Sequence, residues 1–126
     1  MKLTSLYRPV GCAELKLIED ADMKAFPPRL AWQPIFYPVL NREYAQQIAH
    51  DWNTNDEFSG YAGFVTHFQI PESYFQQFEE QNVGSAHHNE LWVPAEELET
   101  FNSKITAPIT VTDAFYGPQF RGEKKY

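Results

Sequence analysis

The stretch His87-His88-Asn89-Glu90-Leu91-Trp92-Val93-Pro94-Ala95-Glu96-Glu97-Leu98 changes its hydrophobic pattern half-way along. Its first half alternates, which predicts a short strand that places Glu90 and Trp92 on the same face. Pro94 suits the first turn of a helix, where a missing N–H costs nothing, so a helix is predicted to run on to about Ile105. The strand is predicted from His88 to Val93. A carboxylate and two imidazoles, those of Glu90, His87 and His88, therefore lie on a rigid strand, where an accurately positioned site is expected.

Alternating and helical patterns extend outward from this stretch. They predict strands at 3–10, 35–37, 61–70 and 109–116, and helices at 12–22, 42–52 and 71–79. Residues 53–60 are predicted to form a polar loop. Asn41 is a good N-cap for the clearest amphipathic helix, whose apolar side is predicted to end at Trp52. This interleaving indicates an α+β fold, with a curved or split mixed sheet and peripheral helices. We expect one domain over 1–116 and a loose polar tail over 117–126.

Composition narrows the class of protein. The chain has 126 residues, a hydrophobic content of 43% and an aromatic content of 16%, which favour a packed globule. It contains no apolar run long enough for a transmembrane helix and no signal-peptide pattern at its beginning, so we expect a cytoplasmic protein. Cys12 is the only cysteine, and the net charge of −7 makes nucleic-acid binding an unlikely function.

The charges are unevenly distributed. Residues 43–103 contain eleven acids and neither lysine nor arginine, whereas six of the ten basic residues lie in 1–42. An anionic ligand is therefore expected to contact this first third of the chain. Arg29 stands in a loop over 25–34 whose three prolines remove N–H donors and fix φ, so that neither a helix nor a central strand forms. Two interpretations stay open: Arg29 clamps a phosphate or a ring there, or it is solvated while Phe26 and Trp32 cap the core.

The sequence does not predict a metal site. The candidate ligands are His67, His87, His88 and Glu90. Adjacent histidines on a strand point to opposite faces, and no His-x-x-x-His or cysteine pair strengthens the case. The remaining constellation is Arg8 at the end of the first strand, the aromatics Phe36 and Tyr37 on the second, and Glu90 on a late strand.

The order of these residues along the predicted strands resembles the order of the NAD-site residues in the ADP-ribosyltransferase-like fold. More closely, the chain resembles a group of short bacterial proteins that carry an ADP-ribosylation/crystallin-like label. The resemblance covers roughly residues 5–115 and is strongest in four segments: Leu6-Tyr7-Arg8-Pro9-Val10-Gly11, Phe26-Pro27-Pro28-Arg29, Gln33-Pro34-Ile35-Phe36-Tyr37-Pro38-Val39-Leu40 and Glu90-Leu91-Trp92-Val93-Pro94-Ala95-Glu96-Glu97-Leu98. No Ser-Thr-Ser follows the second strand, and the position two residues before Glu90 is a histidine, which departs from many transferases.

The resemblance implies NAD as the substrate and assigns roles to seven residues. Glu90 is implied as the catalytic carboxylate that contacts the nicotinamide ribose, with His88 as an acceptor base or as a neighbour that tunes Glu90. The implied NAD-binding residues are Arg8 and Arg29 for the pyrophosphate or ribose, Phe36 or Tyr37 for stacking on the nicotinamide ring, and Tyr7 beside Arg8.

Two other functions stay open at this stage. The chain could be a noncatalytic module that reuses the fold and binds a protein partner through its acidic surface. It could also be an enzyme or binder of another phosphorylated or nucleotide-like small molecule held by Arg8 and Arg29. Fold analogy alone does not choose among the three.

Overall fold

The computed structural model describes residues 2–84 and 88–126, and its central strand is β3 (Ala62–Pro71). β3 pairs antiparallel with β1 (Leu3–Val10) on one side and with β7 (Thr110–Tyr116) on the other. Most β3 side chains are buried on both faces of the sheet, because other elements cover each face. The prediction of a central strand here is confirmed.

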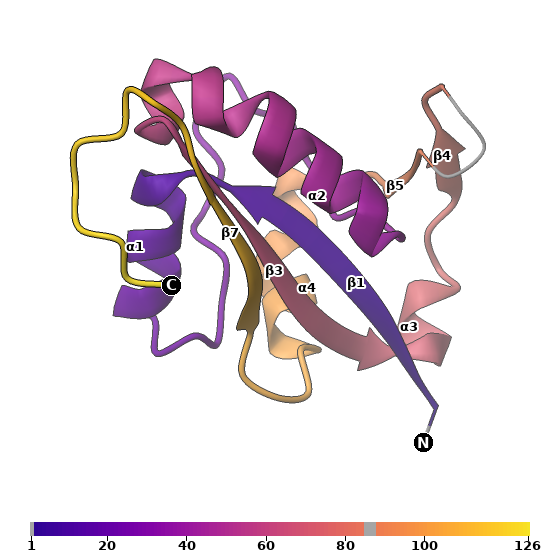
Figure 1. Ribbon diagram of the computed structural model, residues 1–126. Coiled ribbons are helices and arrows are strands. Elements are labelled where there is room, and N and C mark those ends of the chain that lie inside the picture. The colour runs from indigo at the N-terminus through magenta and orange to yellow at the C-terminus, as the bar shows by residue number, and fades with distance from the viewer. Residues whose placement is uncertain (1, 85–87) are drawn as a thin grey trace.

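Helices cover the two faces of this sheet (Figure 1). α2 (Arg42–Asp51) crosses one face, over a small apolar cluster that includes Val39 and Val65. α1 (Cys12–Asp20) and α4 (Leu98–Ser103) pack on the other face, over the larger core, where phenylalanine rings meet edge to face. Helix α2 begins as predicted, since the Asn41 side chain accepts a hydrogen bond from the Tyr44 N–H.

Residues 35–40 extend the sheet beyond β1. β2 (Ile35–Phe36) pairs with β6 (Val93–Pro94), and Val39 forms bridges to Tyr7 on one side and to Glu90 on the other. β4 (Glu80–Asn82) pairs with β5 (Asn89–Leu91). The result is a mixed α+β fold in a single small domain, with open sheets and helices.

Several predicted boundaries are corrected. The strand expected up to Val93 breaks at Trp92 into β5 and β6, and the helix expected from Pro94 begins as a 3₁₀ turn, η3 (Ala95–Glu97), before α4. The helix expected over 71–79 is only the short α3 (Glu72–Phe75), because the polar residues that follow form β4 and pair with β5. Two 3₁₀ turns, η1 (Asn53–Asn55) and η2 (Glu57–Ser59), occupy the predicted polar loop.

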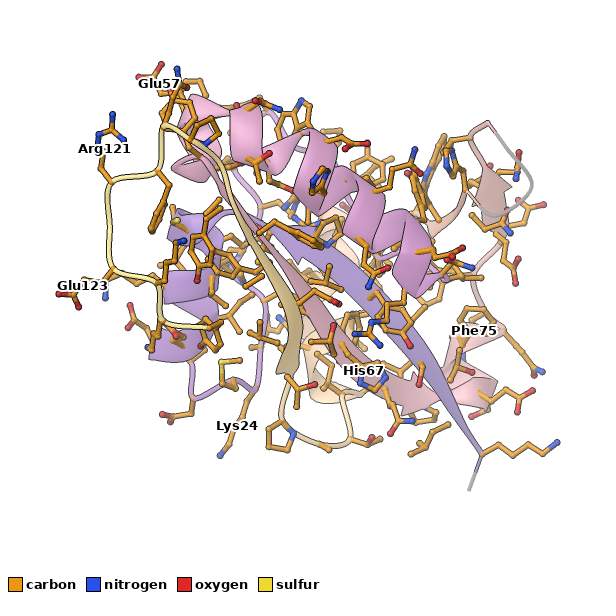
Figure 2. The ribbon with its side chains drawn as sticks, viewed as in Figure 1. Lys24, Glu57, His67, Phe75, Arg121 and Glu123 are labelled. Carbon is orange, nitrogen blue, oxygen red and sulfur yellow. The ribbon has the colours of Figure 1, made fainter. Side chains whose placement is uncertain are left out.

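The C-terminal segment 117–126 runs back beside α1 (Figure 1). Glu19 on that helix accepts a hydrogen bond from the Tyr126 hydroxyl at 2.5 Å and pairs with Lys125 at 2.7 Å. Arg121 and Glu123 project outward from this segment (Figure 2). Among the described residues, no helix is both long and apolar enough to cross a membrane.

Candidate functional site

Three segments that are distant in sequence lie side by side at the end of β1. The Tyr7 N–H donates to the Val39 carbonyl at 2.9 Å, and the Leu91 N–H donates to the Pro38 carbonyl at 2.9 Å. Residues 35–40 therefore run between β1 and the segment that contains Glu90, as the bridges of Val39 to both sides also show.

A cavity of about 250 Å³ opens at this place. Of the seven site residues predicted from the sequence, three line it: Arg8, Tyr37 and Glu90. The other lining residues are Pro9, Val39, Ile48, Trp52 and Asn53. The structure therefore brings together the first-strand arginine, the second-strand aromatic and the late-strand glutamate.

The Glu90 carboxylate is held by two donors. The Tyr44 hydroxyl donates to Oε2 at 2.7 Å, and the Trp92 indole N–H donates to Oε1 at 3.0 Å. Burial, together with the hydrogen bond to Glu90, raises the pKa of the Tyr44 hydroxyl well above its ordinary value. Tyr44 therefore keeps its proton and remains a donor. Because a carboxylate has about four acceptor positions, Glu90 retains capacity for a further donor.

His88 contacts this arrangement through Tyr44. Its ring stacks on the Tyr44 ring, with centroids 4.3 Å apart and an interplanar angle of 14°. Its Nε2 lies 3.1 Å from Oε1 of Gln47 on α2. The imidazole thus packs against the side chain that holds Glu90.

Arg8 is 9% exposed and already has an acidic partner. Its Nε and Nη2 donate to the two carboxylate oxygens of Glu14 at 2.6 and 2.9 Å, and its Nη1 donates to the Tyr37 carbonyl at 3.3 Å. Its guanidinium lies 4.7 Å from the centre of the Phe36 ring. Arg8 therefore ties β1 to α1 and to residues 35–40, a role that the sequence did not indicate.

The aromatic candidates separate into buried and accessible rings. Phe36 is fully buried in the larger core, so it has no surface for stacking on a ligand. Tyr7 packs against the cluster beneath α2, with its ring 5.0 Å from that of His67. Tyr37 is exposed and meets the Trp92 ring edge to face at 6.2 Å. Of the predicted aromatics, Tyr37 is the one that offers a ring to the cavity.

Arg29 lies beside a second, larger cavity of about 410 Å³. Its Nε donates to the Ile35 carbonyl at 3.2 Å, and no described carboxylate lies within ion-pair distance of it. Burial and the nearby charge of Arg8 lower the pKa of its guanidinium, which still remains charged because an arginine pKa starts so high. An unpaired, partly desolvated cation is a suitable contact for a phosphate.

The two cavities share four lining residues: Arg8, Pro9, Trp52 and Asn53. The sequence pattern placed Trp52 on the buried side of its helix, but Trp52 is 60% exposed, because α2 ends at Asp51 and the chain turns there. Asn53 was read as part of a polar loop, yet it is buried. No local sequence pattern predicts that Trp52 or Asn53 lines a cavity, because both reach the cavities only through the tertiary placement of their segment beside the end of β1.

The metal candidates do not come together in the described structure. No group of three or more His, Cys, Asp and Glu side chains suited to a metal ion is found among the described residues. His67 lies on β3 (Figure 2), with its Nε2 2.9 Å from the Ser5 hydroxyl oxygen. His87 lies outside the described residues.

Comparisons with known proteins add no relative. No family model matches this chain, and neither the curated proteins nor the solved structures contain a match.

Proposed function

We propose that this chain has an ADP-ribosyltransferase-like fold and binds NAD in the two neighbouring cavities, transferring or hydrolysing ADP-ribose. The observation that carries the proposal is the meeting of Arg8, Tyr37 and Glu90 at one cavity. These three residues belong to separate segments, and the resemblance of the sequence to ADP-ribosyltransferases singles them out together.

The residues present fit a dinucleotide. The larger cavity, of about 410 Å³, lies within the size range of small-molecule sites, roughly 300–1,000 Å³, and the smaller one, of about 250 Å³, shares lining residues with it. The smaller offers an aromatic ring, Tyr37, and a carboxylate, Glu90. The larger offers the unpaired guanidinium of Arg29. A ring with its ribose would occupy the first and a phosphate the second.

Glu90 is the acting carboxylate in this proposal. NAD supplies an activated bond between its ribose and nicotinamide, and positive charge develops at the ribose as that bond breaks. Glu90 accepts a hydrogen bond from a ribose hydroxyl and stabilises this charge. Tyr44 and Trp92 hold the carboxylate in place before the ligand arrives, and His88 acts as a positioning residue through its stack on Tyr44.

The phosphate contact is assigned to Arg29 in preference to Arg8. Glu14 neutralises the Arg8 guanidinium through two hydrogen bonds, and three of its five N–H donors are used in contacts with described residues. Arg8 thus positions the cavity wall, while Arg29 supplies the charge that attracts an anion.

Isothermal titration with NAD tests this proposal. Wild type is expected to show saturable binding, Arg29→Gln weaker binding, and Glu90→Gln binding without nicotinamide release. Arg42→Gln and Glu97→Gln are matched controls, because Arg42 pairs with Asp113 and Glu97 accepts from Tyr74, away from both cavities. Absence of binding by wild type at millimolar NAD, by heat and by thermal stabilisation, would overturn the proposal.

A protein-interaction module is the second candidate, and a specific surface favours it. Leu17, Leu30 and Phe58 line the larger cavity and are exposed, Phe58 to 92%. Together with the net charge of −7, this surface suits a basic partner with apolar side chains. A complex that is lost in Phe58→Ser and weakened by salt, but kept in Glu90→Gln, would support this function. A complex equally stable in Phe58→Ser would contradict it.

A further inference from the structure

Two guanidinium groups lie against the same buried ring. The Arg8 guanidinium is 4.7 Å and the Arg29 guanidinium 5.9 Å from the centre of the Phe36 ring. Both side chains line the larger cavity, and burial together with the nearby charge of Arg8 lowers the pKa of Arg29. Like charges held in a partly desolvated place disfavour each other, so anionic groups are needed to compensate them.

The described structure supplies one carboxylate for these two cations, that of Glu14. It accepts hydrogen bonds from Arg8 at 2.6 and 2.9 Å. Its charge also acts on Arg29, where it partly offsets the lowering of the pKa. Arg29 itself has no described carboxylate within ion-pair distance. Two positive charges therefore share one negative charge, and this wall of the larger cavity has capacity for a further anion.

Glu14 is placed so that it can leave Arg8 while its helix stays folded. It stands in the first turn of α1, where a carboxylate is favourable even without an ion pair. Its side chain is 23% exposed and lines the larger cavity. The helix is held by Leu15 and Ile18, which are buried in the larger core. Rotation of the Glu14 side chain into solvent would therefore open the donors of Arg8 to the cavity and leave α1 in place.

We propose that Glu14 is a built-in competitor of the ligand's diphosphate, which displaces it from Arg8. One phosphoryl group contacts Arg29, and the second takes the Arg8 donors that Glu14 occupies in the structure. A phosphoryl group suits this exchange because a guanidinium binds its oxygens in the same forked geometry as a carboxylate. This inference rests on the proposed function for the identity of the ligand, and it adds the residue that limits the affinity.

Isothermal titration with inorganic pyrophosphate, and separately with NAD, tests this competition. Glu14→Gln should bind each ligand about tenfold more tightly than wild type, because a neutral amide competes poorly for Arg8. Glu19→Gln is the matched control. It removes the same charge from the same helix, but Glu19 pairs with Lys125 and does not line the larger cavity. This control should bind both ligands like wild type. An equal gain in the two variants would be an effect of net charge and would overturn the inference.

Glu14→Asp decides the question if Glu14→Gln does not fold. It keeps the charge at the start of α1 but shortens the side chain by one methylene, so it should hold Arg8 less well and bind pyrophosphate a few-fold more tightly than wild type. Unchanged or weaker binding in the Glu14 variants, with NAD bound by wild type, would overturn this inference alone, and Glu14 would only tie α1 to β1.

The two ligands separate this inference from the proposed function. Tighter pyrophosphate binding in Glu14→Gln, without NAD binding in any variant, would overturn the proposed function and support the competition at Arg8. No binding of either ligand by wild type or by Glu14→Gln would overturn both.

Discussion

Of the tyrosine–glutamate pairs in the described structure, two that involve Glu90 and Glu97 occupy different regions of the molecule. The Tyr44 hydroxyl donates to Glu90 at 2.7 Å, and the Tyr74 hydroxyl donates to Glu97 at 3.0 Å. In both pairs, burial and the neighbouring carboxylate raise the pKa of the tyrosine. The local contact is the same. Glu90, however, also accepts from Trp92 and lines a cavity.

The second pair performs a structural task. Tyr74 on α3 packs against Phe78 and Phe101, and Lys104 lies 5.6 Å from the centre of its ring. Its bond to Glu97 joins α3 to the turn before α4. A tyrosine–carboxylate hydrogen bond therefore does not by itself indicate a binding site in this fold. Of these two pairs, it is the cavity and the second donor at Glu90 that suggest a ligand.

The largest difference is expected between Glu90→Gln and Glu97→Gln. Glu90→Gln should lower nicotinamide release from NAD by about 100-fold or more, because a neutral amide cannot stabilise the developing positive charge. Glu97→Gln should leave the rate unchanged. The rates are measured by separating free nicotinamide at saturating NAD. Equal losses in the two variants would remove the distinction between the pairs.

Removal of each hydroxyl tests the pairs as structural elements. Tyr44→Phe and Tyr74→Phe should each lower the free energy of unfolding by about 1.5–3 kcal/mol, the range for hydrogen bonds to charged groups. Urea denaturation measures this change. Tyr44→Phe should also slow nicotinamide release, because Glu90 loses a donor that positions it, whereas Tyr74→Phe should not. A wild-type rate in Tyr44→Phe would show that this positioning is unimportant.

Alkaline pH is expected to lower the stability of the fold through both tyrosines, by a smaller amount. A tyrosine in the unfolded chain ionises near pH 10, whereas Tyr44 and Tyr74 in the folded chain hold their protons to higher pH. Above pH 10 the unfolded state therefore binds fewer protons than the folded state, so stability falls as the pH rises, and it is fully present below that pH. Urea midpoints between about pH 9 and 11 should decline in wild type and decline less in each Phe variant. An unchanged slope in both variants would contradict this linkage.

The fold was largely predictable because its main elements have local patterns. Alternation indicated β1, β3 and β7, and Asn41 followed by an amphipathic pattern indicated α2, all of which the structure confirms. Alternation also predicted Glu90 and Trp92 on the same face, and their side chains are hydrogen-bonded. These inferences needed only neighbouring residues.

The parts that were missed depend on tertiary contacts. The turn at Gly11 places α1 so that Glu14 pairs with Arg8, a contact that no local pattern in the sequence indicates. The resemblance implied Phe36 or Tyr37 for ring stacking, and only the tertiary packing shows that Phe36 is buried whereas Tyr37 is exposed. Asn53 gave no signal at all, since its burial and its hydrogen bond to the Ser59 hydroxyl depend on how the chain folds after α2.

The smallest effect is predicted for Trp92, the second donor to Glu90. Among the described contacts, Glu97 has no such second donor. Trp92→Phe removes the N–H that reaches Glu90 and keeps an aromatic ring beside Tyr37. Trp92 is exposed, so water replaces the lost bond, and the free energy of unfolding should fall by less than about 1 kcal/mol. Nicotinamide release should slow a few-fold in this variant.

A double-mutant cycle with Tyr44→Phe separates two explanations of that small change. If Tyr44 and Trp92 jointly fix one carboxylate, then losing either already frees Glu90. The double variant should then be little slower than Tyr44→Phe alone, so that the effects on ln kcat are not additive. Additive effects would mean that Trp92 acts independently of Glu90, through its ring and Tyr37. Glu90 would then resemble Glu97, as a carboxylate held by one tyrosine, and the cavity alone would distinguish the two pairs.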